Sequence, residues 1–96
     1  MIRHVVCYKL KDNSEEACKL TRDILLSMQG KVPQVREVSV GIDFLRSPRS
    51  YDLILQVTFD NREALKEYQQ DPYHVSVVKK HMHAITETSV AVDYEL

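Results

Sequence analysis

Tyr68 and His74 are the side chains of this sequence best suited to acid–base chemistry, and they flank the dipeptide Asp71-Pro72. Proline is tolerated in the first turn of a helix but not in its middle, so a helix is predicted to end here and another to begin, with Asp71 as its N-cap. His74 then lies in the first turn, where the helix dipole favours a neutral imidazole that can accept a proton. The alternative is a structural corner in which Tyr68 packs in the core and His74 helps to cap the helix.

As chemistry, the pair suits an aldol closure or an enolisation. Such a step needs a base of near-neutral pKa to remove a C–H proton and a hydroxyl donor to stabilise the oxyanion that develops. We expect His74 to be the base and Tyr68 the donor or the residue that orients the base. Whether the protein is an enzyme at all is left open by this pattern.

Other polar residues are weaker candidates. His81 and His83 are two apart and would point to different sides of a helix, whereas two metal ligands on one face need a spacing of three or four residues. No metal site and no cofactor are therefore expected. Arg46 and Arg49 flank Pro48 and are typical of a solvated turn.

Composition limits the classes of function. The 96 residues are enough for a single domain, 1–96, and the formal charge of −1 comes without a cationic stripe, so no nucleic acid partner is expected. No apolar run is long enough to cross a membrane and no leader pattern opens the sequence, so a soluble, cytoplasmic protein is expected. Cys7 and Cys18 are expected to stay reduced rather than to pair.

Hydrophobic periodicity predicts six elements that must position these residues. Strand segments alternate apolar and polar residues, and helical segments repeat apolar residues every three or four positions. Asn13 with Glu16, and Asp60 with Glu63, resemble capping boxes, and Gly30 is expected to end the first helix. The predicted order is strand 2–10, helix from 13 to 30, strand 38–44, strand 51–59, a helix from 60 that is broken at 71–72 and continues to 85, and strand 89–94.

This order is that of an α+β, ferredoxin-like fold, with a four-stranded antiparallel sheet and helices on one face. Two helical units cover only one face of the sheet, yet both faces carry apolar residues, such as Val6 on one face of the first strand and Val5 on the other. The second face needs a cover. A second copy of the chain is expected to provide it, because two-fold homodimers are the commonest oligomers, and two facing sheets would form a dimeric α+β barrel.

Five segments, in this order and spacing, resemble the stress-responsive A/B-barrel (Dabb) domain family over nearly the whole chain. They are Met1–Val6, Tyr8–Lys11, Ser50–Leu53, Tyr68–His74 and Val90–Tyr94. The resemblance implies a dimeric α+β barrel. Most members of the family carry no assigned activity, so it implies no reaction.

One group of members, a plant polyketide cyclase, is enzymatic, and its catalytic tyrosine and histidine fall on Tyr68 and His74. Its N-terminal strand histidine falls on His4, which the resemblance places in a pocket between sheet and helices. A histidine on its third strand is Leu53 here, and the histidine before the proline is Asp71, so a plant-like polyketide substrate is not implied. A dimeric barrel monooxygenase is the least favoured reading, because such relatives commonly use a tryptophan and this chain has none.

The sequence therefore predicts a homodimer that binds a small, largely apolar molecule between sheet and helices. The alternative is an acid–base enzyme of the cyclase or isomerase type that uses Tyr68 and His74. The residues expected to line the binding site are His4, Val6, Tyr8, Leu53, Leu55 and Val57.

Overall fold

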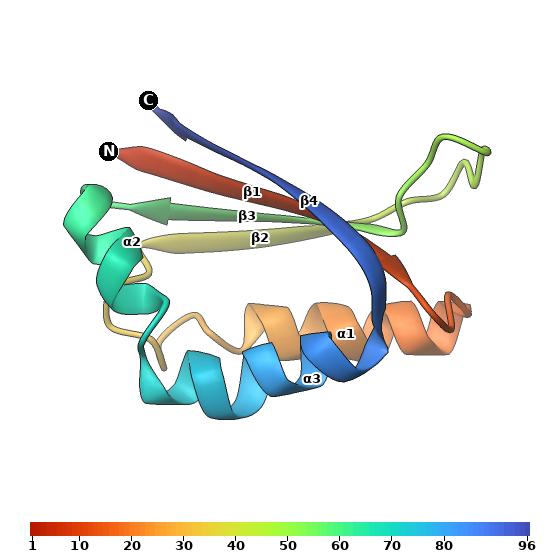
Figure 1. Cartoon of the computed structure of the whole chain (residues 1–96), viewed down its shortest axis with the longest axis horizontal. Helices are drawn as coiled ribbons and strands as arrows, with labels where there is room; N and C mark the ends of the chain where they lie inside the picture. Colours follow the sequence, from red (N-terminus) through yellow and green to blue (C-terminus); the bar gives the residue numbers. More distant parts are fainter.

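The structure, a computed structural model, describes all residues 1–96 and has a four-stranded antiparallel sheet in the order β2-β3-β1-β4 (Figure 1). This is the predicted ferredoxin-like α+β arrangement. The strands are β1 (Ile2–Leu10), β2 (Glu37–Ile42), β3 (Leu53–Phe59) and β4 (Thr86–Glu95). The helices are α1 (Glu15–Leu26), α2 (Arg62–Tyr68), the π-helix η1 (His74–Lys79) and α3 (Lys80–Ile85).

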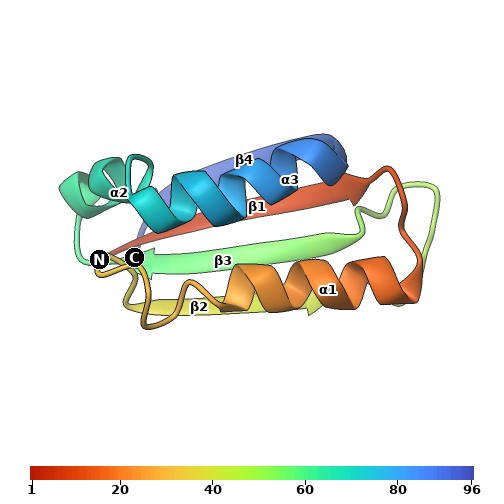
Figure 2. The same ribbon diagram turned by 90° about the horizontal axis from the view of Figure 1, so that it is seen from below.

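All helices lie on one side of the sheet. Figure 2 shows α1 running under β2 and β3, with η1 and α3 beside it under β1 and β4. Strand register fixes which side chains meet these helices. Val6 lies opposite Leu55 on one side and Ala91 on the other, so all three residues share the face that looks toward the helices.

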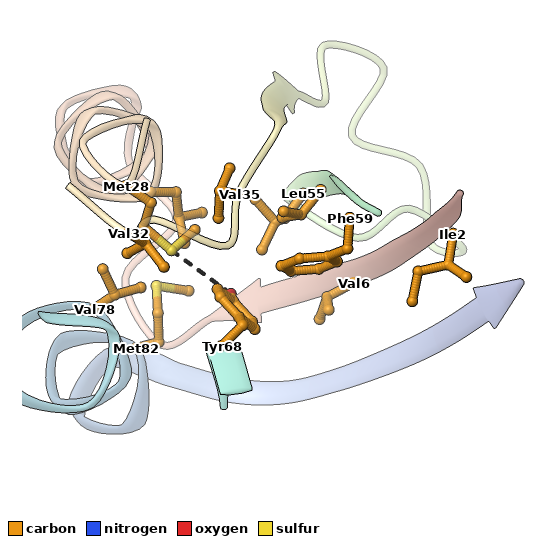
Figure 3. Packing of buried hydrophobic residues seen from close by; sticks show 12 residues of the cluster. Ile2, Val6, Met28, Val32, Val35, Leu55, Phe59, Tyr68, Val78 and Met82 are labelled. Carbon is orange, nitrogen blue, oxygen red and sulfur yellow. Dashed lines mark hydrogen bonds between the residues drawn. The ribbon is translucent and has the colours of Figure 1, made fainter. Parts of the chain in front are cut away.

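The core fills the space between the two layers. Phe59, Leu55 and Val57 from β3 pack against Leu25 and Met28 from the α1 segment, and each of these side chains is at most 1% exposed (Figure 3). Because β3 is a central strand and α1 lies directly beneath it, its helix-facing residues have no route to solvent. Burial of this kind is the main force that holds the helices to the sheet.

Two helix starts differ from the predicted ones by one residue. Ser14, not Asn13, caps α1, because its side chain accepts a hydrogen bond from the Ala17 N–H, whereas the Asn13 amide donates to Asp52. Asn61, not Asp60, caps α2. In each case two adjacent polar residues could serve as caps, and the contacts of the neighbour decide which one does.

Two further boundaries differ by more than one residue. Helix α1 ends at Leu26, and Gly30 (φ +84°) lies in the turns that follow it, not directly after the helix. Strand β4 begins at Thr86, three residues before the predicted start, because Thr86 and Thr88 pair with the end of β1. Because of this extension, β4 begins directly after the last residue of α3.

The sheet face opposite the helices is open in the single chain and is partly apolar. Val90, Val92 and Tyr94 of β4 are 50%, 63% and 43% exposed, and they lie beside Val5 and Cys7 of β1 on that face. We call this surface the outer face. No helix is long and apolar enough to cross a membrane.

Candidate functional site

A groove of about 440 Å³ opens between the β1–β4 edge of the sheet and the helical segment formed by η1 and α3. Its apolar wall consists of Val6, Val78, Met82 and the ring of Tyr68. This volume is within the range of small-molecule sites. Its polar lining includes Tyr8, His74, Lys79, His83, Thr86 and Glu87.

The helix break at Asp71-Pro72 is formed as predicted. One carboxylate oxygen of Asp71 accepts hydrogen bonds from the backbone N–H groups of Tyr73 (2.9 Å) and His74 (3.1 Å), so Asp71 is the N-cap. The helix that follows is not the predicted α-helix, because its residues from His74 to Lys79 form a π-helix. Single π turns are rare in proteins, and those that do occur are often found at functional sites.

Tyr68 and His74 are brought together by stacking. Their ring centroids are 4.0 Å apart, with an angle of 24° between the ring planes. The Tyr68 hydroxyl points into the core, where it donates to the Met28 sulfur at 3.6 Å (Figure 3). Burial raises the pKa of Tyr68, and the phenol is 2% exposed. In this arrangement Tyr68 orients the imidazole, while its hydroxyl belongs to the core.

His74 is held in a neutral state at neutral pH. Burial lowers the pKa of His74 below its ordinary value of 6.5, the Lys79 and His4 charges lower it further, and the backbone of Tyr68 opposes the shift. The Nδ1 atom is buried without a hydrogen-bond partner. The other ring nitrogen, Nε2, is therefore the one that a molecule in the groove could contact.

His4 lies on the predicted face but beside the groove, not in its lining. Its Nδ1 atom pairs with the Asp93 carboxylate of β4, and its ring meets Tyr68 edge-on with centroids 6.0 Å apart. Asp93 was not singled out in the sequence, because only the β1–β4 register places it opposite His4. His4 thus contacts the site through Tyr68.

The remaining predicted lining residues divide into two sets. Val6 and Tyr8 line the groove, whereas Leu53, Leu55 and Val57 lie in the core and are at most 2% exposed. The structure does not bring these three to the groove. They share the helix-facing side of the sheet with Val6, as expected, but α1 covers β3 while the groove opens over β1 and β4.

Tyr8 is the phenol whose hydroxyl is free for a ligand. It lines the groove with His74, and its hydroxyl makes no hydrogen bond within the chain. Burial raises the pKa of Tyr8 to about 12, so the group is a protonated donor at neutral pH.

The sequence also offered possible metal ligands, loop arginines and two cysteines. No group of three His, Cys, Asp or Glu residues could hold a metal ion. Arg46 lies in the loop after β2 and donates to the backbone carbonyl of Asn13. Both cysteines are free thiols.

The sequence pattern of the Stress responsive A/B Barrel Domain family (Dabb) matches residues 2–96. The chain belongs to the Dabb family. A stress-response A/B barrel domain-containing protein of Arabidopsis thaliana is 29% identical over an alignment of 96 positions, which covers 98% of this chain. The chain spans 36% of the length of that relative, so the whole relative is much longer than the shared domain.

Solved structures share the fold. A dimeric protein of unknown function with a ferredoxin-like fold from Bacteroides fragilis is 26% identical, covers 99% of this chain and 95% of its own, and has a TM-score of 0.78. A hydroxynitrile lyase from Passiflora edulis is 19% identical, covers 99% of this chain and 92% of its own, and has a TM-score of 0.83. At that identity the likeness is one of fold alone.

Proposed function

We propose that this Dabb domain binds a small, largely apolar molecule in the groove between β1–β4 and η1–α3. The observation that carries the proposal is a groove of about 440 Å³ in which an apolar wall of Val6, Val78 and Met82 faces a polar side that includes the free Tyr8 hydroxyl and the neutral His74. Ligand sites combine these two kinds of surface, because the apolar wall supplies affinity and the polar groups fix orientation.

We also propose that the domain is a homodimer in which a second copy covers the outer face. Val90, Val92 and Tyr94 are large apolar side chains of β4 that are at least 43% exposed. Contiguous exposed apolar surface marks an interaction site, and a two-fold partner is the commonest occupant. The Bacteroides fragilis protein of the same fold is described as dimeric, which supports this assembly.

The binding proposal is tested by filling the groove. Ser89 is exposed at the groove and lies opposite Tyr8, so a Ser89→Trp side chain would occupy the space. Glu16→Trp on the exposed side of α1 is the matched control. We expect an apolar fluorescent probe such as N-phenyl-1-naphthylamine to bind the wild type and Glu16→Trp, and to bind Ser89→Trp at least tenfold more weakly. Equal binding by all three proteins would place the probe elsewhere and refute the groove as the site.

A second function, acid–base catalysis, is favoured by one specific observation. His74 has a lowered pKa and stands in the same groove as the protonated Tyr8 hydroxyl. In this proposal His74 removes a proton from carbon, Tyr68 fixes the imidazole by stacking, and Tyr8 donates to the oxyanion. The hydroxynitrile lyase of Passiflora edulis supports it to the extent that this fold hosts an enzyme.

The catalytic proposal is tested with a panel of small β-dicarbonyl compounds that can enolise. We expect His74→Gln to lower the rate of deuterium exchange at the acidic carbon by about 10²-fold or more, the usual contribution of a general base. Binding of the fluorescent probe should be retained. A wild-type rate no greater than that of buffer, or an unchanged rate in His74→Gln, would refute the mechanism while leaving the binding proposal intact.

A further inference from the structure

We propose that the ligand of the groove is an apolar molecule with one carboxylate, and that Lys79 is the residue that binds this carboxylate. The inference rests on the proposed binding function and names the chemical class of the ligand. It follows from the winding of the helix, from the distribution of charge in the groove, and from unpartnered polar groups in the wall.

The π-helix places Lys79 on the same side of the helix as His74. In an α-helix, a residue five positions after His74 is rotated about 140° away from it, and its side chain would point to another side. In a π-helix the hydrogen bonds join residues five apart, so positions 74 and 79 lie on the same side of the helix. Both residues line the groove, together with Val78 between them, and the Lys79 charge acts on the His74 imidazole.

The charge of Lys79 is free for a ligand, because this residue takes part in no ion pair within the chain. His83 lies one α-helical turn further along and also lines the groove. Glu87, at the start of β4, is the single acidic residue in the lining and is itself unpaired. One lysine beside an apolar wall suits one carboxylate, whereas a dianion would meet the Glu87 charge without a second fixed cation.

The groove wall also holds polar atoms without partners. The Thr86 hydroxyl oxygen is buried and makes no hydrogen bond within the chain, and the Tyr8 hydroxyl makes none either. Buried polar atoms are nearly always satisfied, so orphaned ones in the wall of a cavity call for an explanation. A carboxylate at Lys79 would lie near the hydroxyls of Thr86 and Tyr8, which can donate to its oxygens. The apolar part of the ligand would then lie on Val78 and Met82.

The test compares 2-naphthoate with its neutral isostere 2-naphthamide by isothermal titration calorimetry. The proteins are the wild type, Lys79→Met and the matched control Lys80→Met, since Lys80 is also exposed but does not line the groove. We expect the wild type to bind the carboxylate about fivefold more tightly than the amide, as for a good solvent-accessible ion pair. Lys79→Met should lose this preference, Lys80→Met should keep it, and Glu87→Gln should increase it.

Salt gives an independent readout. In 500 mM NaCl the preference of the wild type for the carboxylate should shrink, while amide binding should stay the same, because only the charged contact is screened. Equal affinity for both compounds in the wild type, or a preference that survives in Lys79→Met, would overturn the carboxylate assignment. If 2-naphthamide still bound when either of these results was obtained, the groove would remain the proposed binding site. Failure of both compounds to bind would overturn the assignment together with the binding function.

Discussion

Replacing Tyr68 separates its two contributions, the ring and the hydroxyl. The ring stacks on His74 at 4.0 Å, packs against Phe59 at 4.9 Å and meets His4 at 6.0 Å between centroids. The hydroxyl makes one hydrogen bond, to the Met28 sulfur. Because sulfur is a weak acceptor, Tyr68→Phe should lower the free energy of unfolding by only about 0.5 kcal/mol, the low end for a hydrogen bond.

Tyr68→Leu removes the aromatic contacts and leaves a cavity, and we expect a loss of about 3 kcal/mol. For a domain of this size, that loss corresponds to a drop of more than about 10 °C in Tm, whereas Tyr68→Phe should shift it by only a few degrees. Urea unfolding measures the loss of unfolding free energy in each variant. The protein concentration is held constant because dimerisation would contribute to stability.

The same two variants test whether the Tyr68 hydroxyl acts in the groove. Since the hydroxyl points into the core, Tyr68→Phe should bind 2-naphthoate with the wild-type affinity. Tyr8→Phe is the matched control, because it removes the phenol that does face the groove, and it should weaken binding. A Tyr68→Phe variant that loses more than about 2 kcal/mol of stability, or that loses affinity as Tyr8→Phe does, would refute this reasoning.

Three further predictions concern pH, the helix break and the assembly. Because the pKa of His74 is lowered in the folded state, the unfolded chain binds more protons than the folded chain as the pH falls below 6.5. In urea titrations the wild type should therefore lose more stability between pH 7.5 and 5.0 than His74→Gln does. Equal losses would contradict the lowered pKa. Asp71→Ala should cost about 1 kcal/mol in the same assay, whereas Asp71→Asn, which keeps the accepting oxygen, should cost less; the reverse order would rule out the cap. Val92→Lys should convert the dimer to the 11.2 kDa monomer in sedimentation equilibrium, and a wild type that is already monomeric would refute the dimer.

Strands and their faces could be predicted from the sequence because alternation is a local signal. It placed β1 at its observed bounds and put Val6 and Tyr8 on one face, which the resemblance to the Dabb family assigned to the helix-facing side. It missed the first three residues of β4, because Thr86–Thr88 are polar throughout and become a strand only by pairing with β1. Helix caps failed by one residue for a related reason, since Asn13 and Ser14 are both good caps and a distant partner, Asp52, decides between them.

The candidate site could be predicted only in part. The Asp71-Pro72 signal located the helix break, and with it the approach of His74 to Tyr68. The pairing of Lys79 with His74 could not be predicted, because a period of 3.6 residues per turn separates them by about 140° and nothing local in residues 74–79 distinguishes a π-helix from an α-helix. The burial of Leu53 beneath α1 was missed for a different reason, since sharing a sheet face does not say which helix covers which strand.

The central claim is that a small apolar molecule binds between the sheet and the helices, and isotope-filtered NOE spectroscopy of bound 2-naphthamide tests it most directly. The neutral compound is chosen so that the result does not depend on Lys79. We expect NOEs from the naphthalene protons to the methyl groups of Val78 and Met82, which form the groove wall. NOEs to Val90 and Val92 on the outer face, with none to the groove, would contradict the claim.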